Sequence, residues 1–244
     1  YNMFRIFGPT AAAARLAGLD AEKSLMAMGL AYMQAGGDMQ AYKDGALSVR
    51  VQQGLVGDAA LKAVYLAERG VTGSRNILQG PFGYYNAYEP EHDLAPLTAD
   101  LGRVYEGVKS AFKPFPCCAC THASITAALH LVTRHDIRPE EVVQVDVAVD
   151  TQSFNLVAQP RELKARPKQV VDGQFSVPFT VARAILNRDV FVADFTEQTI
   201  RDPATLALAE KVAVTCDSQL DGRAGYPAVL TIRTKRGDFS HRVD

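Results

Sequence analysis

Residues 141–150 read EVVQVDVAVD, and this stretch decides the fold class because its pattern differs from that of the chain before it. Valine occupies every second position from Val143 to Val149, with Gln, Asp, Ala and Asp filling the alternate positions. Such an alternation with a period of two is typical of a strand that buries one of its faces. We therefore expect a β-sheet in the second half of the chain.

The first half has a helical period instead. An Ala-rich run opens at Gly8 and stops near Gly18, and Asp20 precedes a second run whose apolar residues recur at helical spacing. A third helix is expected from about Gly54 to Arg69. These segments contain many Ala and Gly residues, so their helices are expected to approach one another closely.

The rest of the second half combines helices with a hairpin. Helical signals cover residues 176–187, 196–201 and 202–214, and residues 227–244 are typical of a hairpin that turns at Lys235 to Asp238. The sequence thus predicts an all-α helical domain followed by a smaller α+β two-layer domain. Prolines punctuate residues 90–116, which places the expected domains at 1–112 and 113–244.

Composition restricts the class of partner. The 244 residues carry a net charge of -1, with acidic and basic residues interspersed, which gives no basic patch for a nucleic acid. No apolar run approaches the roughly 20 residues of a membrane helix. Three of the four cysteines are crowded together and cannot staple a chain of this length, so we expect a cytoplasmic protein with a small-molecule partner.

The crowded cysteines lie in KPFPCCACTHA, residues 113–123. This segment lacks the C-x-x-C spacing that zinc and iron–sulfur sites favour, although His122 added to the thiols would give a conceivable metal-binding face. In an extended segment Cys118 and Cys120 share a face and Cys117 points away. The competing interpretation is that Cys117, Cys120 and the distant Cys216 are small buried apolar residues.

The residues around the thiols suggest chemistry of another kind. Prolines keep Lys113 to Phe115 extended, and we expect Thr121 to cap a helix whose first turn holds a neutral His122. Lys113 is flanked by Phe112 and Phe115, and the expected desolvation would lower the pKa of its ammonium group. A lysine and a neutral imidazole suit an anionic substrate that loses a proton. A surface lysine and a helix-capping histidine are the alternative.

Four segments together resemble one protein family. They are FGPTAAAARLAGLD at 7–20, LSVRVQQG to ERGVTG at 47–73, KPFPCCACTHA at 113–123 and GQFSVPFTVARAIL at 173–186. In this order they resemble the MmgE/PrpD family, whose members include 2-methylcitrate dehydratase, cis-aconitate decarboxylase and iminodisuccinate epimerase. The resemblance implies a helical domain joined to a smaller α+β domain, with the active site in the cleft between them. It also implies that this chain is an interior piece of a longer homodimeric protein.

The resemblance implies a reaction as well. Family members remove a proton next to a carboxylate without a metal or cofactor, and a polycarboxylate that develops enolate charge requires preorganised cations and hydrogen-bond donors. We expect a 2-methylcitrate dehydratase-like lyase or an isomerase that acts on a small polycarboxylate. Two alternatives stay open: a non-catalytic relative that binds an anion or dimerises, and a thiol-based redox or metal protein.

The resemblance also assigns site residues. Lys113 takes the position of an active-site lysine, His122 belongs to the Thr-His pair, and Cys118 is a possible acid/base thiol with an inert thiol as the alternative. The expected substrate-binding residues are Arg50, Tyr84, Gln174 and Ser176. The competing roles are a surface ion pair for Arg50, core packing for Tyr84 and its neighbour Tyr85, and a helix cap for Ser176.

Departures from the family pattern reduce the range of reactions that we expect of this chain. Decarboxylase-like members have a histidine where this chain has Cys118 and a tyrosine where it has Phe179. Many members have a Trp-His pair in place of residues 1–2 and a lysine in place of Val49. Two proton-transfer groups and one cation are therefore missing, which disfavours decarboxylation of cis-aconitate.

Overall fold

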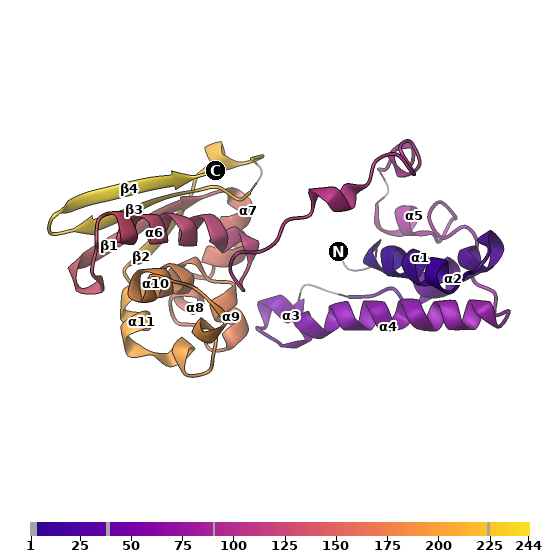
Figure 1. Ribbon diagram of the computed structural model, residues 1–244, viewed down its shortest axis with the longest axis horizontal. Helices are drawn as coiled ribbons and strands as arrows, with labels where there is room; N and C mark the ends of the chain where they lie inside the picture. The colour runs from indigo at the N-terminus through magenta and orange to yellow at the C-terminus, as the bar shows by residue number, and fades with distance from the viewer. Residues whose placement is uncertain (1–3, 38–39, 90, 224) are drawn as a thin grey trace. The chain divides into compact units, whose positions relative to one another are not determined.

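The structure, a computed structural model, describes residues 4–37, 40–89, 91–223 and 225–244 and divides into two compact units, Tyr1–Ser110 and Ala111–Asp244 (Figure 1). The described part of the first unit contains helices and no strand. Its α-helices are α1 (Phe7–Leu16), α2 (Ala21–Met33), α3 (Gln40–Lys43), α4 (Ser48–Glu68) and α5 (Tyr84–Tyr88).

The core of the first unit joins α1, α2 and α4 through small residues. Ala14, Ala27 and Ala63 are almost fully buried where these helices meet. A Cβ atom on Gly29 would lie 2.3 Å from the carbonyl oxygen of Ser74, so the chain approaches α2 too closely for any side chain there. The contacts through small residues expected between these helices are present at the buried alanines, whereas the close approach at Gly29 is to the non-helical segment at Ser74.

The predicted start of α2 agrees with the structure, whereas the predicted start of α4 does not. The Asp20 side chain accepts the Lys23 amide at 2.8 Å and caps α2 as predicted. The expected start of α4 at Gly54 is wrong, because the helix begins at Ser48. Nothing lies within 4 Å of a Cβ built on Gly54, which indicates that this glycine is an exposed helical position and not a boundary.

The second unit packs helices against one four-stranded sheet (Figure 1). Its α-helices are α6 (His122–Arg134), α7 (Thr151–Ser153), α8 (Arg161–Ala165), α9 (Val170–Gln174), α10 (Val177–Asn187) and α11 (Pro203–Ala209), and its shorter helices include η4 (Ala119–Thr121) and η8 (Thr199–Arg201). Its strands are β1 (Val142–Val149), β2 (Val212–Cys216), β3 (Ala228–Thr234) and β4 (Gly237–Val243).

The strand order is β2-β1-β3-β4, with β1 and β2 parallel and the other neighbours antiparallel. Helices α6 and α10 share one core with the buried face of this sheet, whereas Asp146 and Arg233 form an ion pair of 2.6 Å on the other face. This is a two-layer α+β arrangement, and the hairpin expected at residues 227–244 is confirmed as β3 and β4.

Three predictions for this unit need correction. Val143 is 56% exposed and Val142 is buried, because the register with β3 shifts between Val142 and Gln144. The helix expected at 202–214 ends at Ala209, and β2 begins at Val212. Residues Val212–Cys216 form a strand because they pair with β1, and their valines favour a strand. Of the helix expected at 196–201, only the short η8 forms.

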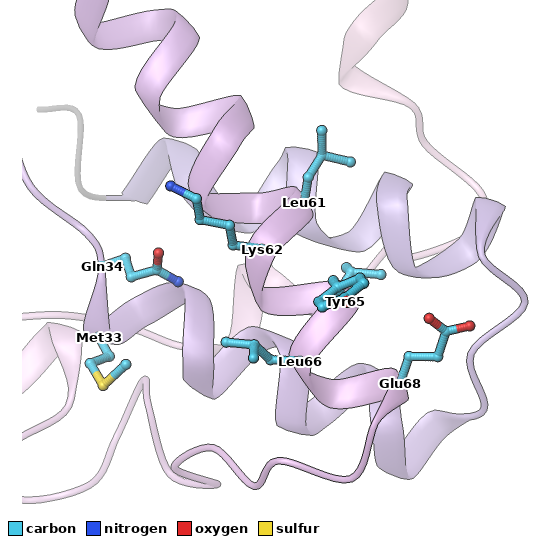
Figure 2. A pocket seen from close by; sticks show the side chains of 8 residues that line it. Met33, Gln34, Leu61, Lys62, Tyr65, Leu66 and Glu68 are labelled. Carbon is cyan, nitrogen blue, oxygen red and sulfur yellow. The ribbon is translucent and has the colours of Figure 1, made fainter.

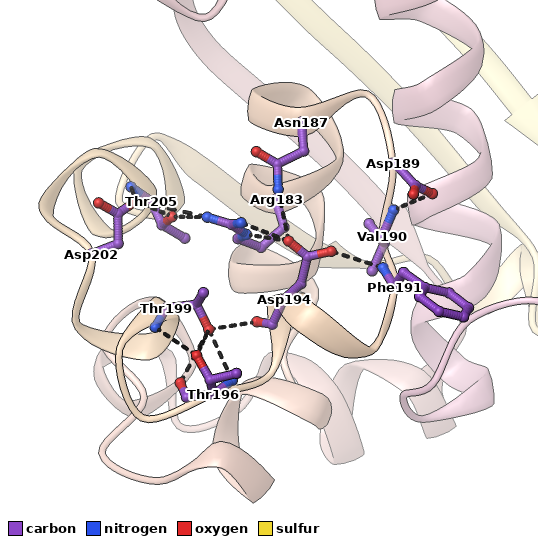
Figure 3. Close-up of polar contacts among 10 residues, drawn as sticks. All are labelled: Arg183, Asn187, Asp189, Val190, Phe191, Asp194, Thr196, Thr199, Asp202 and Thr205. Atoms are coloured by element: carbon purple, nitrogen blue, oxygen red, sulfur yellow. Dashed lines mark hydrogen bonds and ion pairs between the residues drawn. The ribbon is translucent and has the colours of Figure 1, made fainter.

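A polar network ties α10 to the loop before α11 (Figure 3). The Arg183 guanidinium donates to Asp194 at 2.6 and 2.8 Å and to Thr205 at 2.9 Å. Asn187 donates to the same Asp194 oxygen at 2.7 Å. Asp194 is 5% exposed, so this carboxylate is buried with its donors in place.

Among the described residues, none of the helices is both long and apolar enough to cross a membrane.

Candidate active site

The segment at residues 113–123 is anchored within the second unit and leads directly into α6. The Cys118 amide donates to the Gln174 carbonyl at 2.9 Å, and Gln174 Nε2 donates to the Pro116 carbonyl at 3.2 Å. Lys113 Nζ donates to the Cys117 carbonyl at 3.1 Å. Gln174 therefore holds the segment in place, a positioning role that differs from the direct substrate contact expected from the sequence.

The three thiols of this segment have different environments. Cys117 is buried and lies 3.1 Å from the Thr121 hydroxyl, and burial raises its pKa to about 11. Cys118 is half-buried, and a hydrogen bond from the Cys120 side chain is the main cause that lowers its pKa to about 7. The same hydrogen bond raises the pKa of Cys120. The Cys118 and Cys120 side chains therefore meet, as the prediction of a shared face requires, although Ala119–Thr121 form η4 and are not extended. Cys118 is the thiol prepared to lose its proton.

His122 is the first residue of α6 and is half-buried. Its ring meets that of Phe115 edge to face with the centroids 5.5 Å apart, and burial is the main cause that lowers its pKa. The Nε2 atom is buried and has no hydrogen-bond partner within the described residues. The imidazole is therefore neutral at pH 7, as expected, and its Nε2 atom is enclosed by the protein.

Thr121 does not cap α6 with its side chain, so that prediction is wrong. Its hydroxyl donates to the Cys118 carbonyl at 2.8 Å instead. The expected desolvation of Lys113 is also wrong, because Lys113 is exposed and the neighbouring Phe112 is completely exposed.

A second lysine lies at this site, and sequence reasoning missed it. Lys164 in α8 is 4% exposed, and its charge acts together with that of Lys113 to lower the pKa of Cys118, after the larger effect of Cys120. Lys164 lies in RELKARPK among other charged residues, a context typical of a solvated loop. Nothing in that local pattern signals burial.

Behind the thiols lies a buried carboxylate. Asp150, which is 6% exposed, accepts the Ser153 amide at 3.0 Å and the Ser153 hydroxyl at 2.5 Å. Ser153 also hydrogen-bonds the Cys120 side chain. Asp150 and Tyr226 line a cavity of about 770 Å³. Asp150 directly follows the alternating valines, so the sequence pattern could have placed it at the end of a strand.

Ser176 is fully buried, and its hydroxyl is used within the protein. It accepts the Phe179 amide at 3.0 Å as the cap of α10 and donates to the Lys164 carbonyl at 2.5 Å. These contacts favour the helix-cap role over the substrate contact that the resemblance implied.

Arg50 and Tyr84 lie in the first unit. Arg50 is exposed on α4. Tyr84 is half-buried in an aromatic cluster, with its ring 5.1 Å from Phe4 and 5.3 Å from Tyr85, and burial raises its pKa. The aromatic contacts favour packing for Tyr84. The roles of both residues in binding a substrate stay predictions.

The first unit also has an apolar groove of about 810 Å³ on α2 and α4 (Figure 2). Met33, Leu61 and Tyr65 line it and are all exposed. Lys62 at its edge pairs with Asp58 at 2.5 Å. None of the predicted site residues lines this groove, and it gathers no group of catalytic side chains.

Metal and disulfide chemistry receive no support from the described residues. They contain no group of three or more His, Cys, Asp or Glu side chains that can hold a metal ion. All four cysteines are free. The expectation that Cys216 is buried is wrong, because this thiol is exposed near the end of β2.

The fold and this site define a protein with a helical unit and an α+β unit, the latter carrying a thiol, an exposed lysine and a neutral imidazole at the start of α6. Residues 3–97 match the MmgE/PrpD N-terminal domain, and residues 115–244 match the MmgE/PrpD C-terminal domain. The chain therefore belongs to the MmgE/PrpD family.

Several curated relatives are similar over most of this chain. Cis-aconitate decarboxylase of Aspergillus terreus is 26% identical over an alignment of 247 positions, which covers 94% of this chain and 49% of the relative. Cis-aconitate decarboxylase of Homo sapiens is 25% identical over 215 residues, which cover 84% of this chain and 42% of the relative. The chain spans about half the length of the curated relatives it matches.

Proposed function

We propose that this protein is a lyase or isomerase that acts on a small polycarboxylate by removing a proton from the carbon next to a carboxylate. The observation that carries the proposal is the meeting of Lys113, Cys118 and a neutral His122 where α6 begins. Membership of the family supports it, as do relatives that carry the name cis-aconitate decarboxylase.

In this proposal each group has a role that follows from its environment. The exposed ammonium of Lys113 binds a carboxylate and stabilises the enolate charge that develops next to it. Cys118, with a pKa lowered to about 7, takes up the proton. His122, whose ring packs edge to face against Phe115, orients the segment that carries Lys113 and Cys118.

Dehydration of a 2-methylcitrate-like acid remains our favoured reaction within this class. Decarboxylase-like members of the family have a histidine and a tyrosine where this chain has Cys118 and Phe179, which disfavours decarboxylation. Activity without a metal or cofactor, the homodimer and the cytoplasmic location stay predictions.

The test uses the shared first step of all these reactions. The protein is incubated in deuterated water with a panel of citrate-like acids, and the carbon-bound hydrogens are followed by proton NMR. We expect exchange or conversion with at least one acid. A folded protein that exchanges none of them would leave the anion-binding alternative, which the missing proton-transfer groups favour. The redox alternative rests on the facing Cys118 and Cys120 thiols, and it predicts a reversible disulfide.

A further inference from the structure

Two histidines from different elements stack on one another in the second unit. His130 lies on α6 and His241 lies on β4, and their rings are nearly parallel, with 14° between the planes and 3.9 Å between the centroids. Just past the end of α6, the His135 ring meets Phe239 of β4 with the centroids 4.5 Å apart. Two ring contacts therefore connect this helix with a strand that lies about a hundred residues further along the chain.

The strand that carries His241 is an edge strand. It stands at the end of the order β2-β1-β3-β4 and pairs with β3. Its alternate residues Phe239, His241 and Val243 are half-buried, and Phe239 and Val243 pack against the core. His241 thus takes a core-facing position between two apolar neighbours. Because an edge strand has a neighbour on one side only, the contacts that α6 makes with these side chains contribute to holding it in place.

The stack is sensitive to protons because both members are imidazoles. Neutral rings can lie face to face, whereas two imidazolium rings at this separation repel each other. His241 is also affected by positive charge from α6: burial is the main cause that lowers its pKa, followed by the charges of His130 and Arg134. Leu230, its partner on β3, is apolar. A proton added to His241 is therefore opposed by Arg134 and, once protonated, by His130.

Other charged groups of β3, β4, their turn and the end of α6 form ion pairs of their own. These pairs are Arg233 with Asp238, Arg236 with Glu141, Arg242 with Asp244, and Arg188 with Asp136. Their carboxylates already have cationic partners, so the two stacked rings are the groups of this contact whose charge changes near neutral pH.

We propose that His130 and His241 form a proton-sensitive contact, which holds β4 against α6 while the rings are neutral and loosens that strand when both rings are protonated. The stacked geometry and the edge position of the strand carry this proposal, which does not rest on the proposed function. Each ring takes up one proton from water, so no other reactant is needed.

The direction of the effect follows from proton linkage. The pKa of His241 in the folded chain lies below the ordinary value of 6.5, which a loosened strand regains. Between these two values the loosened strand holds more protons than the closed one, so acidification favours the loosened strand. We therefore expect the contact to be complete above pH 6.5 and to weaken as the pH falls below it.

The first measurement follows the His241 ring by proton NMR between about pH 5 and 8. His130 is exposed, so His130→Phe should fold; it keeps a ring against His241 and removes the charge. The pKa of His241 should then rise toward 6.5. His92→Phe makes the same change at an exposed histidine of the first unit and should leave the pKa of His241 unchanged. An equal pKa of His241 in the wild type and in His130→Phe overturns the proposal.

The second measurement follows hydrogen exchange of the β4 amides at about pH 5 and about pH 7.5, relative to an unstructured peptide. In the wild type, protection of β4 should fall in acid by up to about tenfold, the factor that corresponds to one pKa unit. His241→Phe cannot take up the proton and should keep its protection at both pH values. The β1 amides serve as the internal reference and should stay protected.

Three results of this second measurement reject the proposal. Protection of β4 that does not change with pH means that protonation does not loosen the strand. A loss that persists in His241→Phe belongs to another group, such as His122, whose pKa is also lowered by burial. An equal loss in β1 means that the whole unit opens. Neither measurement needs a substrate, so the outcome is independent of the proposed activity.

Discussion

Gln174 binds the backbone on both sides of Cys117: its carbonyl accepts the Cys118 amide at 2.9 Å, and its side chain donates to the Pro116 carbonyl at 3.2 Å. These two bonds connect the end of α9 to the segment that carries the candidate catalytic groups. The geometry of the site therefore depends on a residue that need not touch a substrate.

Replacing Gln174 with Leu should loosen this segment. The Pro116 carbonyl loses a donor, so we expect the free energy of unfolding to fall by about 1 kcal/mol. The Cys118 amide should also exchange its hydrogen faster. Urea denaturation and amide hydrogen exchange measure the two effects. Gln219→Leu alters an exposed glutamine and should stay within about 0.5 kcal/mol. Equal stability of the two variants would show that the side-chain bond contributes nothing.

The thiols predict how stability changes with pH. Folded Cys118 has a pKa of about 7 against 9.0 for an ordinary thiol, so between these values only the unfolded chain holds the proton. Stability therefore rises with pH over this window, by at most about 1.4 kcal/mol per pH unit, and the gain is lost as the pH falls to 7. Above pH 9 the raised pKa of Cys117, about 11, and the raised pKa of Cys120 have the opposite sign and stability falls.

Urea midpoints measured from pH 6 to 10 check this dependence. Cys118→Ser should remove the rise between pH 7 and 9. Cys216→Ser removes an exposed thiol and serves as its control. A rise that persists in Cys118→Ser would assign it to another group.

Lys113 provides a direct test of the site under the proposed function. Lys113→Met removes the exposed cation, and we expect hydrogen exchange of the responsive acid to fall by about 100-fold or more, the typical loss for one stabilising donor. The control is Lys109→Met, which removes an exposed lysine paired with Glu106 and should exchange at the wild-type rate. Equal rates in the two variants would remove Lys113 from the mechanism.

The Arg183–Asp194 pair predicts a large loss of stability. Both side chains are nearly buried, with 11% and 7% exposed, and the ion pair measures 2.6 Å. Arg183→Met leaves the Asp194 carboxylate without its cation, which should cost about 3–5 kcal/mol in urea denaturation. Asp58→Asn breaks the exposed pair with Lys62 and should cost about 0.5 kcal/mol or less. A similar cost for both variants would contradict the role assigned to burial.

The sequence predicted those features that local rules determine. Asp20 caps α2 and the valines of β1 alternate, because capping and pleating depend on residues close in sequence. It failed at Val143 and at Val212–Cys216, where pairing with a distant strand decides the structure. For the same reason Lys164 was missed, since α8 packs against α9 and α10, which lie further along the chain.

Phe179 carries the last prediction, because it stands where decarboxylase-like members of the family have a tyrosine. Its side chain is fully buried in the core, with the Phe195 ring centroid 6.1 Å away, and a Cβ atom on Gly173 would lie 3.3 Å from its ring. Phe179→Tyr therefore adds a hydroxyl group to an apolar core, which should cost about 1–3 kcal/mol in urea denaturation.

Phe191→Tyr is the matched control, because Phe191 is 62% exposed and the added hydroxyl group reaches water. We expect no decarboxylation of cis-aconitate by Phe179→Tyr, since the hydroxyl group is added inside the core. A Phe179→Tyr protein as stable as the wild type would mean that the hydroxyl group has found a partner. One that also releases carbon dioxide would mean that the ring borders the substrate, and the core assignment of Phe179 would then be wrong.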